Sequence, residues 1–214
     1  MSFEIRPARP EDAEFIAWVM LAAGRSHLSY GVWDHYIGRT EEERLAFLTA
    51  LSLTAAPHPF HHSIFIVAEE HGNPIAGLCG YDPAFLNMGN YLQSLPEVFE
   101  KRRWSKDDQR AAFKRIISFL CCIPANASGA WIIDSVATLP QARRRGIISK
   151  LLEHIIAKGR SLGLKRAQIN VLIGNIPAWR SYENRGFTFD YEKRNPQFET
   201  TYVSPGIARL LRGT

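Results

Sequence analysis

The chain has 214 residues, of which 46% are hydrophobic and 22% charged, a size and composition that favour one globular domain over two. No apolar run approaches the roughly 18 residues that cross a membrane, so we expect a soluble protein with no membrane partner. The formal net charge of +5 suits an anionic partner, either a nucleic acid or a phosphorylated cofactor, and does not choose between them.

The N-terminal stretch MSFEIR mixes acidic, basic and apolar residues, unlike a secretory leader, so we expect a cytoplasmic protein. Phe3, Ile5 and Pro7 predict a short first strand. Pro10 and the two acidic residues after it predict the start of a helix that ends near Gly24.

A second helix is predicted from Thr40, because Thr40 and Glu43 have the spacing of a capping box, to about Leu53. Two strands follow at residues 63–69 and 74–81. The turn sequence HGN between them indicates an antiparallel hairpin. The histidines of the stretch HPFHH that precedes the hairpin have no Cys or carboxylate nearby at ligand spacing, so no metal site is predicted.

Residues 84–128 predict a largely helical insertion, with its clearest helix at about 107–122. From residue 130 onward strands alternate with helices. Strands are predicted at 130–138, 165–173, 187–193 and 199–203, and helices over the segment that ends at Ser161 and over 177–185. The strand-helix-strand units require a parallel pair with a right-handed crossover, whereas the hairpin is antiparallel. The predicted fold class is therefore α/β with a mixed sheet.

Three consecutive arginines, Arg143, Arg144 and Arg145, stand directly before Gly146 and an apolar helix. Cations at a helix N-terminus oppose the helix dipole and cost up to about 1 kcal/mol each, so an anion is expected there. Free N–H groups at the start of a helix that lies firmly on a sheet form a site for a pyrophosphate. The sequence has neither a Walker loop nor a dinucleotide fingerprint at this point, which disfavours those two classes of protein.

A second motif is the stretch NIPAWRSYENRGF, residues 175–187. At 100° per residue Asn175, Tyr182 and Gly186 fall on one line of a helix, with Ala178 beside it. An isolated tyrosine is ordinarily a half-buried aromatic residue, but Tyr182 shares its helix face with the Asn175 amide and with Gly186, which has no side chain. The pattern therefore favours a functional role for Tyr182.

Together the two motifs resemble the GNAT superfamily of CoA-dependent N-acetyltransferases. Residues 143–148 are similar to the family's Arg/Gln-x-x-Gly-x-Gly/Ala motif and depart from it at Ile148, and residues 175–187 match the pattern Asn-x-x-Ala-x-x-x-Tyr-x-x-x-Gly-Phe. The opening FEIRPARPEDAEFI is also similar to family openings. Residues 134–140 and 205–211 resemble members of this superfamily from plants and bacteria. This second resemblance does not indicate which amine accepts the acetyl group.

The resemblance implies one N-acetyltransferase domain over residues 1–214, with residues 84–128 outside the common core. The implied fold is a twisted, mostly antiparallel sheet of six to seven strands with a splayed parallel pair and helices on both faces. Acetyl-CoA would lie between the two splayed strands. The cofactor-binding residues implied are Val136, Ala137, Thr138, Arg143, Arg144, Arg145, Gly146, Ile147, Ile148, Ser149, Asn175, Ala178 and Tyr182.

The resemblance also implies direct attack of a primary amine on the thioester in a ternary complex, with Tyr182 giving a proton to the CoA thiolate. A phenol with a pKa of about 10 can protonate a thiolate whose conjugate acid lies near 8.5, by analogy with Cys, with a modest uphill step. Asp134 is a candidate general base acting through water. Its alternative role is structural, as a hydrogen-bond partner of a neighbouring strand.

Tyr30, Trp33 and Asp34, from the stretch HLSYGVWDHYIG, are candidates to line the amine site, and the alternative is ordinary packing of Trp33 and Tyr36 under a loop. The acceptor is a small-molecule or peptide amine of unspecified identity, and a homodimer is compatible with the sequence. Two other functions stay open: a GNAT fold that binds CoA without catalysis, and a basic nucleic-acid-binding module, which is disfavoured because no aromatic platform or recognition helix is evident.

Overall fold

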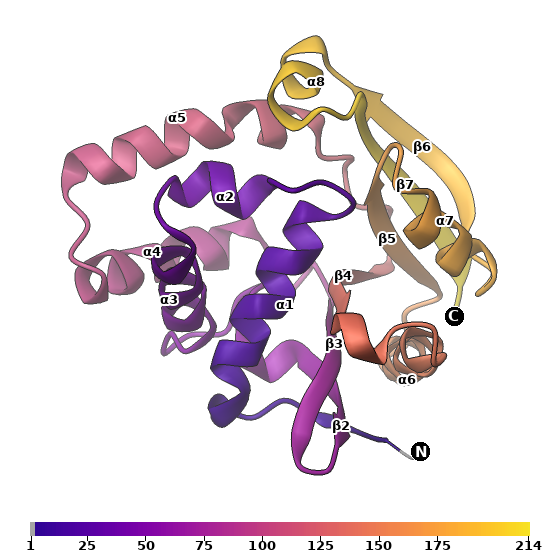
Figure 1. Cartoon of the computed structure of the whole chain (residues 1–214). Helices are drawn as coiled ribbons and strands as arrows, with labels where there is room; N and C mark the ends of the chain where they lie inside the picture. Colours follow the sequence, from indigo (N-terminus) through magenta and orange to yellow (C-terminus); the bar gives the residue numbers. More distant parts are fainter. Residues whose placement is uncertain (1–2) are drawn as a thin grey trace.

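The computed structural model describes residues 3–214 and has a seven-stranded sheet at its centre (Figure 1). Met1 and Ser2, which begin the stretch that we interpreted as unlike a leader, lie outside the described residues. The strand order is β1-β2-β3-β4-β5-β7-β6. The strands are β1 (Glu4–Pro7), β2 (Phe65–Glu70), β3 (Asn73–Tyr81), β4 (Ala130–Thr138), β5 (Arg166–Leu172), β6 (Thr188–Arg194) and β7 (Gly206–Gly213).

Every pair of neighbouring strands is antiparallel except β4 and β5, which are parallel. The hairpin of β2 and β3 and the crossover from β4 to β5 were both predicted from local sequence pattern. The prediction of a mixed, mostly antiparallel sheet with one parallel pair is confirmed.

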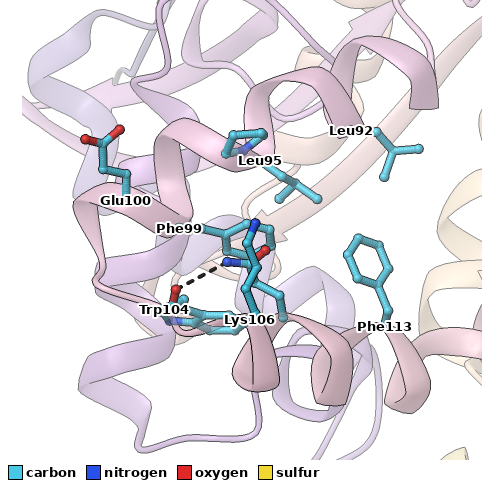
Figure 2. A pocket seen from close by; sticks show the side chains of 9 residues that line it. Leu92, Leu95, Phe99, Glu100, Trp104, Lys106 and Phe113 are labelled. Atoms are coloured by element: carbon cyan, nitrogen blue, oxygen red, sulfur yellow. Dashed lines mark hydrogen bonds between the residues drawn. The ribbon is translucent and has the colours of Figure 1, made fainter.

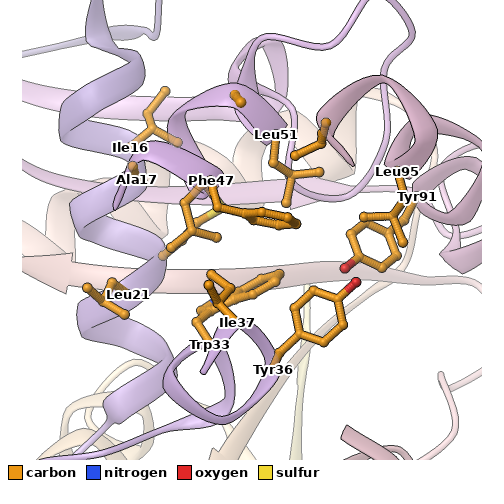
Figure 3. Packing of buried hydrophobic residues seen from close by; sticks show 14 of the residues in the cluster. Ile16, Ala17, Leu21, Trp33, Tyr36, Ile37, Phe47, Leu51, Tyr91 and Leu95 are labelled. Atoms are coloured by element: carbon orange, nitrogen blue, oxygen red, sulfur yellow. The ribbon is translucent and has the colours of Figure 1, made fainter. Parts of the chain in front are cut away.

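Helices cover both faces of the sheet (Figure 1). The helices are α1 (Ala13–Arg25), α2 (Val32–Ile37), α3 (Glu41–Ser52), α4 (Met88–Lys101), α5 (Lys106–Cys122), α6 (Ile147–Ser161), α7 (Ile176–Glu183) and α8 (Pro196–Tyr202). Side chains of α1 to α5 form one core on the first face (Figure 3). The opposite face packs against α6 and α7, where the apolar stripe of α6 is buried as its periodicity predicts.

Residues 84–128 contain α4 and α5, in agreement with the helical character predicted for this segment. Side chains from α4, α5 and their connection line a pocket, among them Leu92, Phe99, Trp104 and Phe113 (Figure 2). No strand contributes to the lining of this pocket, so it is separate from the strand ends that the sequence motifs indicate.

The prediction of a strand at residues 199–203 is wrong, because this segment belongs to α8. Asn195 caps the helix by accepting a 3.0 Å hydrogen bond from the Phe198 amide, and Pro196 occupies the first helical turn. Phe198 and Tyr202, four residues apart, are both buried on one side of the helix. The last strand is instead β7, which lies between β5 and β6.

Among residues 3–214, no helix combines the length and apolar character that a membrane crossing requires.

Candidate active site where β4 and β5 separate

Strands β4 and β5 pair only over their first residues and then separate. Their register runs from Ala130 opposite Arg166 to Ile133 opposite Ile169. Beyond that point β4 continues to Thr138 beside β3, and β5 continues to Leu172 beside β7. Residues 134–138 therefore have a backbone edge that faces the gap between the two strands.

A β-bulge lies in β4 where this separation begins. Cys79 of β3 is opposite Asp134 and Gly77 is opposite Ala137, so two residues of β4 stand against one of β3. The first of the two is Ser135, whose φ of 52° lies in the left-handed region. A bulge bends and twists its strand, which accounts for the divergence of β4 from β5.

The connection between β4 and α6 presents several backbone amides with no protein partner. Arg144 and Gly146 have positive φ angles of 60° and 73°. Across residues 3–214, no acceptor is hydrogen-bonded to the N–H groups of residues 144–149, and the first bonded amide is that of Lys150. Amides at the positive end of a buried helix bind anions, so this segment fits the diphosphate that the arginine motif predicts.

The three arginines of the motif differ in their surroundings. Arg145 makes a two-point ion pair with Glu70 at the end of β2, with N···O distances of 2.5 and 3.1 Å. The hydrogen bonds from Arg145 lower the pKa of Glu70. Arg143 and Arg144 are exposed beside the unbonded amides, and Arg143 donates a weak 3.4 Å bond to the Thr138 carbonyl.

Tyr182 is buried on α7 with only 7% of its surface exposed, and its ring packs against Phe187. Its hydroxyl has no hydrogen-bond partner within residues 3–214. The oxygen is not fully enclosed, so it reaches solvent. Burial and then the negative charge of Asp134 raise the pKa of Tyr182 well above its usual value. The phenol is therefore protonated at neutral pH, and its proton transfer to a thiolate is further uphill than the reference pKa of about 10 predicts.

Asp134 lies at the point where the strands separate. Desolvation by the surrounding protein raises the pKa of the Asp134 carboxyl group, although the residue is partly exposed to solvent. Within the described chain its carboxylate is bonded only by Ser135, through the amide and the hydroxyl, and it takes part in no ion pair. The site thus holds a carboxylate with no countercharge.

Sequence reasoning missed Tyr81, which also lies at this point. Tyr81 and Cys79 are on the same face of β3, and Cys79 is directly opposite Asp134. The alternation of side chains along residues 74–81 predicts on which face of the strand Tyr81 lies. Nothing in the local sequence, however, indicates which strand pairs with β3 on that side.

The Asn175 side chain joins two helices. Its Oδ1 accepts a hydrogen bond from the Ala178 amide and so caps α7, while its Nδ2 donates a 2.6 Å bond to the Ser26 hydroxyl just after α1. Ala178 packs against the core formed with α6. The proposed cofactor residue Asn175 therefore also anchors the connection between α1 and α2.

The three candidates for the amine site are mostly engaged within the protein. Asp34 is fully buried and accepts hydrogen bonds from Arg25, Arg44 and the Gly31 amide, so it has no oxygen accessible to an acceptor. Trp33 packs in the core against an aromatic ring. The Tyr30 hydroxyl bonds the Asp34 carbonyl and Arg44. Asp34 thus joins α2 to Arg25 and Arg44 through ion pairs, and a role of Tyr30, Trp33 and Asp34 at the amine site stays a prediction.

The histidines before the hairpin are bonded to protein atoms: His58 to Thr54, His61 to Ser63 and His62 to the Ser52 carbonyl. Within residues 3–214 no three or more His, Cys, Asp or Glu side chains come together in a way that could hold a metal ion.

Solved acetyltransferases share this fold. One acetyltransferase is similar over 98% of each chain, with 21% identity and a TM-score of 0.70. An N-acetyltransferase from Staphylococcus aureus Mu50 is 19% identical over 97% of this chain and 99% of its own, with a TM-score of 0.65. The protein yncA from Salmonella typhimurium, solved with its cofactor acetyl-CoA, is 17% identical over 100% of this chain and 94% of its own, with a TM-score of 0.53.

None of the curated proteins compared with the chain matches it. The sequence profile of the acetyltransferase (GNAT) family, however, matches residues 29–187, which is more than half of the chain and includes both motifs. With the separated parallel strands and the matching folds, this profile confirms the resemblance: the chain belongs to the GNAT acetyltransferase family.

Proposed function

We propose that the protein transfers an acetyl group from acetyl-CoA to a primary amine by direct attack in a ternary complex. Family membership establishes acetyl transfer in general, and the unbonded amides at the start of α6 carry the proposal for this chain. One solved structure of the same fold is an agmatine N-acetyltransferase, and agmatine is an amine. That likeness supports an amine acceptor here without identifying it.

The cofactor fits between β4 and β5. The free backbone edge of residues 136–138 would pair with the pantetheine arm as an added strand does. The N–H groups of residues 144–149 would bind the diphosphate, with Arg143 and Arg144 adding positive charge. Asn175 and Ala178 would contact the arm from α7.

The chemistry requires a neutral amine, a stabilised oxyanion and a proton for the leaving thiolate. Asp134 would take the proton of the amine, and the Val136 N–H would polarise the thioester carbonyl. Tyr182 would protonate the thiolate, because its hydroxyl is unbonded and reaches solvent.

Proton uptake by Asp134 helps Tyr182 to act as the acid. Burial is the larger cause of the raised pKa of Tyr182, and the negative charge of Asp134 is the second. When Asp134 accepts a proton this charge disappears, and the pKa of the phenol falls. The base therefore makes the phenol a stronger acid at the step that needs it.

The variant Tyr182→Phe tests the proposal. We expect the rate of free-thiol release at saturating acetyl-CoA to fall roughly 100-fold or more, with little change in acetyl-CoA affinity. Tyr191→Phe, at an exposed tyrosine on β6, is the matched control and should leave both quantities unchanged. An unchanged rate in Tyr182→Phe would remove this proton donor from the mechanism.

Binding and turnover separate the other functions. Thermal stabilisation by acetyl-CoA and none by an oligonucleotide is expected, and the reverse would favour a nucleic-acid-binding module. Binding of acetyl-CoA without acetylation of any amine in a broad panel would favour a CoA-binding protein without catalysis.

A further inference from the structure

The Asp134 carboxylate has an unmatched negative charge. No Arg, Lys or His of the described chain forms an ion pair with it, and its two hydrogen bonds come from the neutral Ser135. A crowded carboxylate is stabilised when a cation pairs with it. An acceptor that arrives as a primary ammonium ion would supply this missing charge.

Tyr81 lies beside this carboxylate on the next strand. Since Cys79 is directly opposite Asp134 and Tyr81 follows it by two residues, the phenol and the carboxylate are diagonal neighbours on one face of the sheet. Such diagonal pairs are about 7–8 Å apart at the backbone, a separation that an aromatic side chain bridges. The negative charge of Asp134 is, after burial, the next largest cause of the raised pKa of Tyr81, which agrees with this proximity.

The Tyr81 hydroxyl is also available to a ligand. The ring packs against the core of α1 to α5, but the hydroxyl has no hydrogen-bond partner in residues 3–214 and is not fully enclosed. Tyr36, by contrast, has a hydroxyl that is enclosed in the core beside Tyr91 (Figure 3). Tyr81 therefore differs from a packing tyrosine in that its oxygen reaches solvent next to an unpaired carboxylate.

We infer that Tyr81 and Asp134 together bind the amino group of the acceptor as a primary ammonium ion, an inference that rests on the proposed function. An ammonium has three N–H donors. One donates to a carboxylate oxygen of Asp134 and one to the phenolic oxygen of Tyr81. The two bonds orient the nitrogen toward the gap between β4 and β5, where the thioester would lie.

The protons balance in the resulting reaction. Asp134 takes one proton from the ammonium and releases it to solvent, which leaves a neutral amine. The amine nitrogen forms the C–N bond, the C–S bond breaks, and Tyr182 gives its proton to the thiolate. The second proton lost by the nitrogen returns to Tyr182 through Asp134 and water. The net products are the amide, CoA thiol and one proton in solvent.

The variant Tyr81→Phe tests this inference, with a panel of linear monoamines and diamines as acceptors. For the amine that is acetylated fastest we expect KM to rise roughly tenfold, because one hydrogen bond to a charged group is lost. The kcat value and the KM for acetyl-CoA should stay unchanged. Tyr191→Phe is the matched control and should leave the KM of the amine unchanged.

A cation without N–H groups separates the roles of the two residues. n-Butyltrimethylammonium should compete with the amine, because it carries the positive charge but cannot donate a hydrogen bond or lose a proton. Its dissociation constant, measured by calorimetry because Asp134→Asn lacks the proposed base, should rise in Asp134→Asn and stay the same in Tyr81→Phe. Equal weakening in both variants would show that Tyr81 shapes the pocket instead of bonding the nitrogen, and would overturn the inference.

The outcomes distinguish this inference from the proposed function. If Tyr81→Phe leaves the KM of the amine within twofold of the parent value while thiol release continues, the role of Tyr81 is disproved and the acetyltransferase proposal stands. If no amine of the panel is acetylated although acetyl-CoA binds, the proposed function fails and the inference fails with it.

Discussion

Asn175 Nδ2 donates a 2.6 Å hydrogen bond to Ser26 Oγ, and this bond joins the start of α7 to the end of α1 across 149 residues of sequence. Ser26 has φ 60° and ψ −118°, a backbone conformation that an L-residue rarely adopts. The bond therefore fixes an unfavourable turn beside the proposed pantetheine site. Asn175 has two tasks, as the cap of α7 and as the partner of Ser26.

Two variants separate these tasks. Ser26→Ala removes the bond between the helices and a long 3.4 Å contact of Ser26 Oγ with His27 Nδ1, whereas Asn175→Ala removes the bond between the helices and the cap of α7. We expect Asn175→Ala to lower the free energy of unfolding by about 1 kcal/mol more than Ser26→Ala, since a lost N-cap costs that much. Denaturant unfolding measures both values. Equal losses would mean that the cap contributes nothing.

The ion pair of Arg145 with Glu70 predicts opposite effects on acetyl-CoA binding. Glu70→Gln removes a negative charge next to the proposed diphosphate site and releases Arg145, so affinity should rise about threefold. Arg145→Ala leaves Glu70 unpaired near the diphosphate, and affinity should fall roughly threefold to tenfold.

The double variant completes this cycle and should bind acetyl-CoA about as the parent protein does, which calorimetry can check. Both single effects should shrink at high salt, because the groups are near the surface. If Glu70→Gln weakens binding instead, Glu70 serves to position Arg145 for the diphosphate.

Stability should depend on pH through His58, which is fully buried. Burial lowers the pKa of His58 from 6.5 to about 4. Its Nδ1 accepts a hydrogen bond from the Phe60 amide, so a proton added there would break that bond. The unfolded chain binds this proton at a higher pH than the folded protein does.

The free energy of unfolding should therefore fall as the pH drops from about 6.5 to 4, by roughly 3 kcal/mol from this residue. An NMR titration of the His58 ring should give a midpoint near pH 4 in the folded protein. A midpoint close to 6.5 would contradict the assignment of the stability loss to His58.

Local pattern was enough to predict much of the fold. The hairpin of β2 and β3, the capped helix α3 and the crossover from β4 to β5 each depend on residues that are close in sequence. The secondary structure near residue 200 was harder to predict. Residues 200–203 are β-branched or aromatic and have strand propensity, but burial of Phe198 and Tyr202 against α5 favours a helix.

Site residues could be predicted from the sequence only where they lie within one continuous segment. The motifs at residues 143–148 and 175–187 lie within single turns or helices, so their spacing is visible in the sequence. The ion pair of Arg145 with Glu70 joins residues 75 positions apart, and the diagonal of Tyr81 and Asp134 depends on how β3 pairs with β4. Such contacts between distant segments exist only after the sheet has formed.

The position of β7 affects how the protein is made. Because β7 lies between β5 and β6 but follows both in the chain, a ribosome releases β5 and β6 before the strand that joins them. During that interval both strands expose unpaired edges, which are places where chaperones or other nascent chains can bind. We expect closure of this half of the sheet to follow translation of β7.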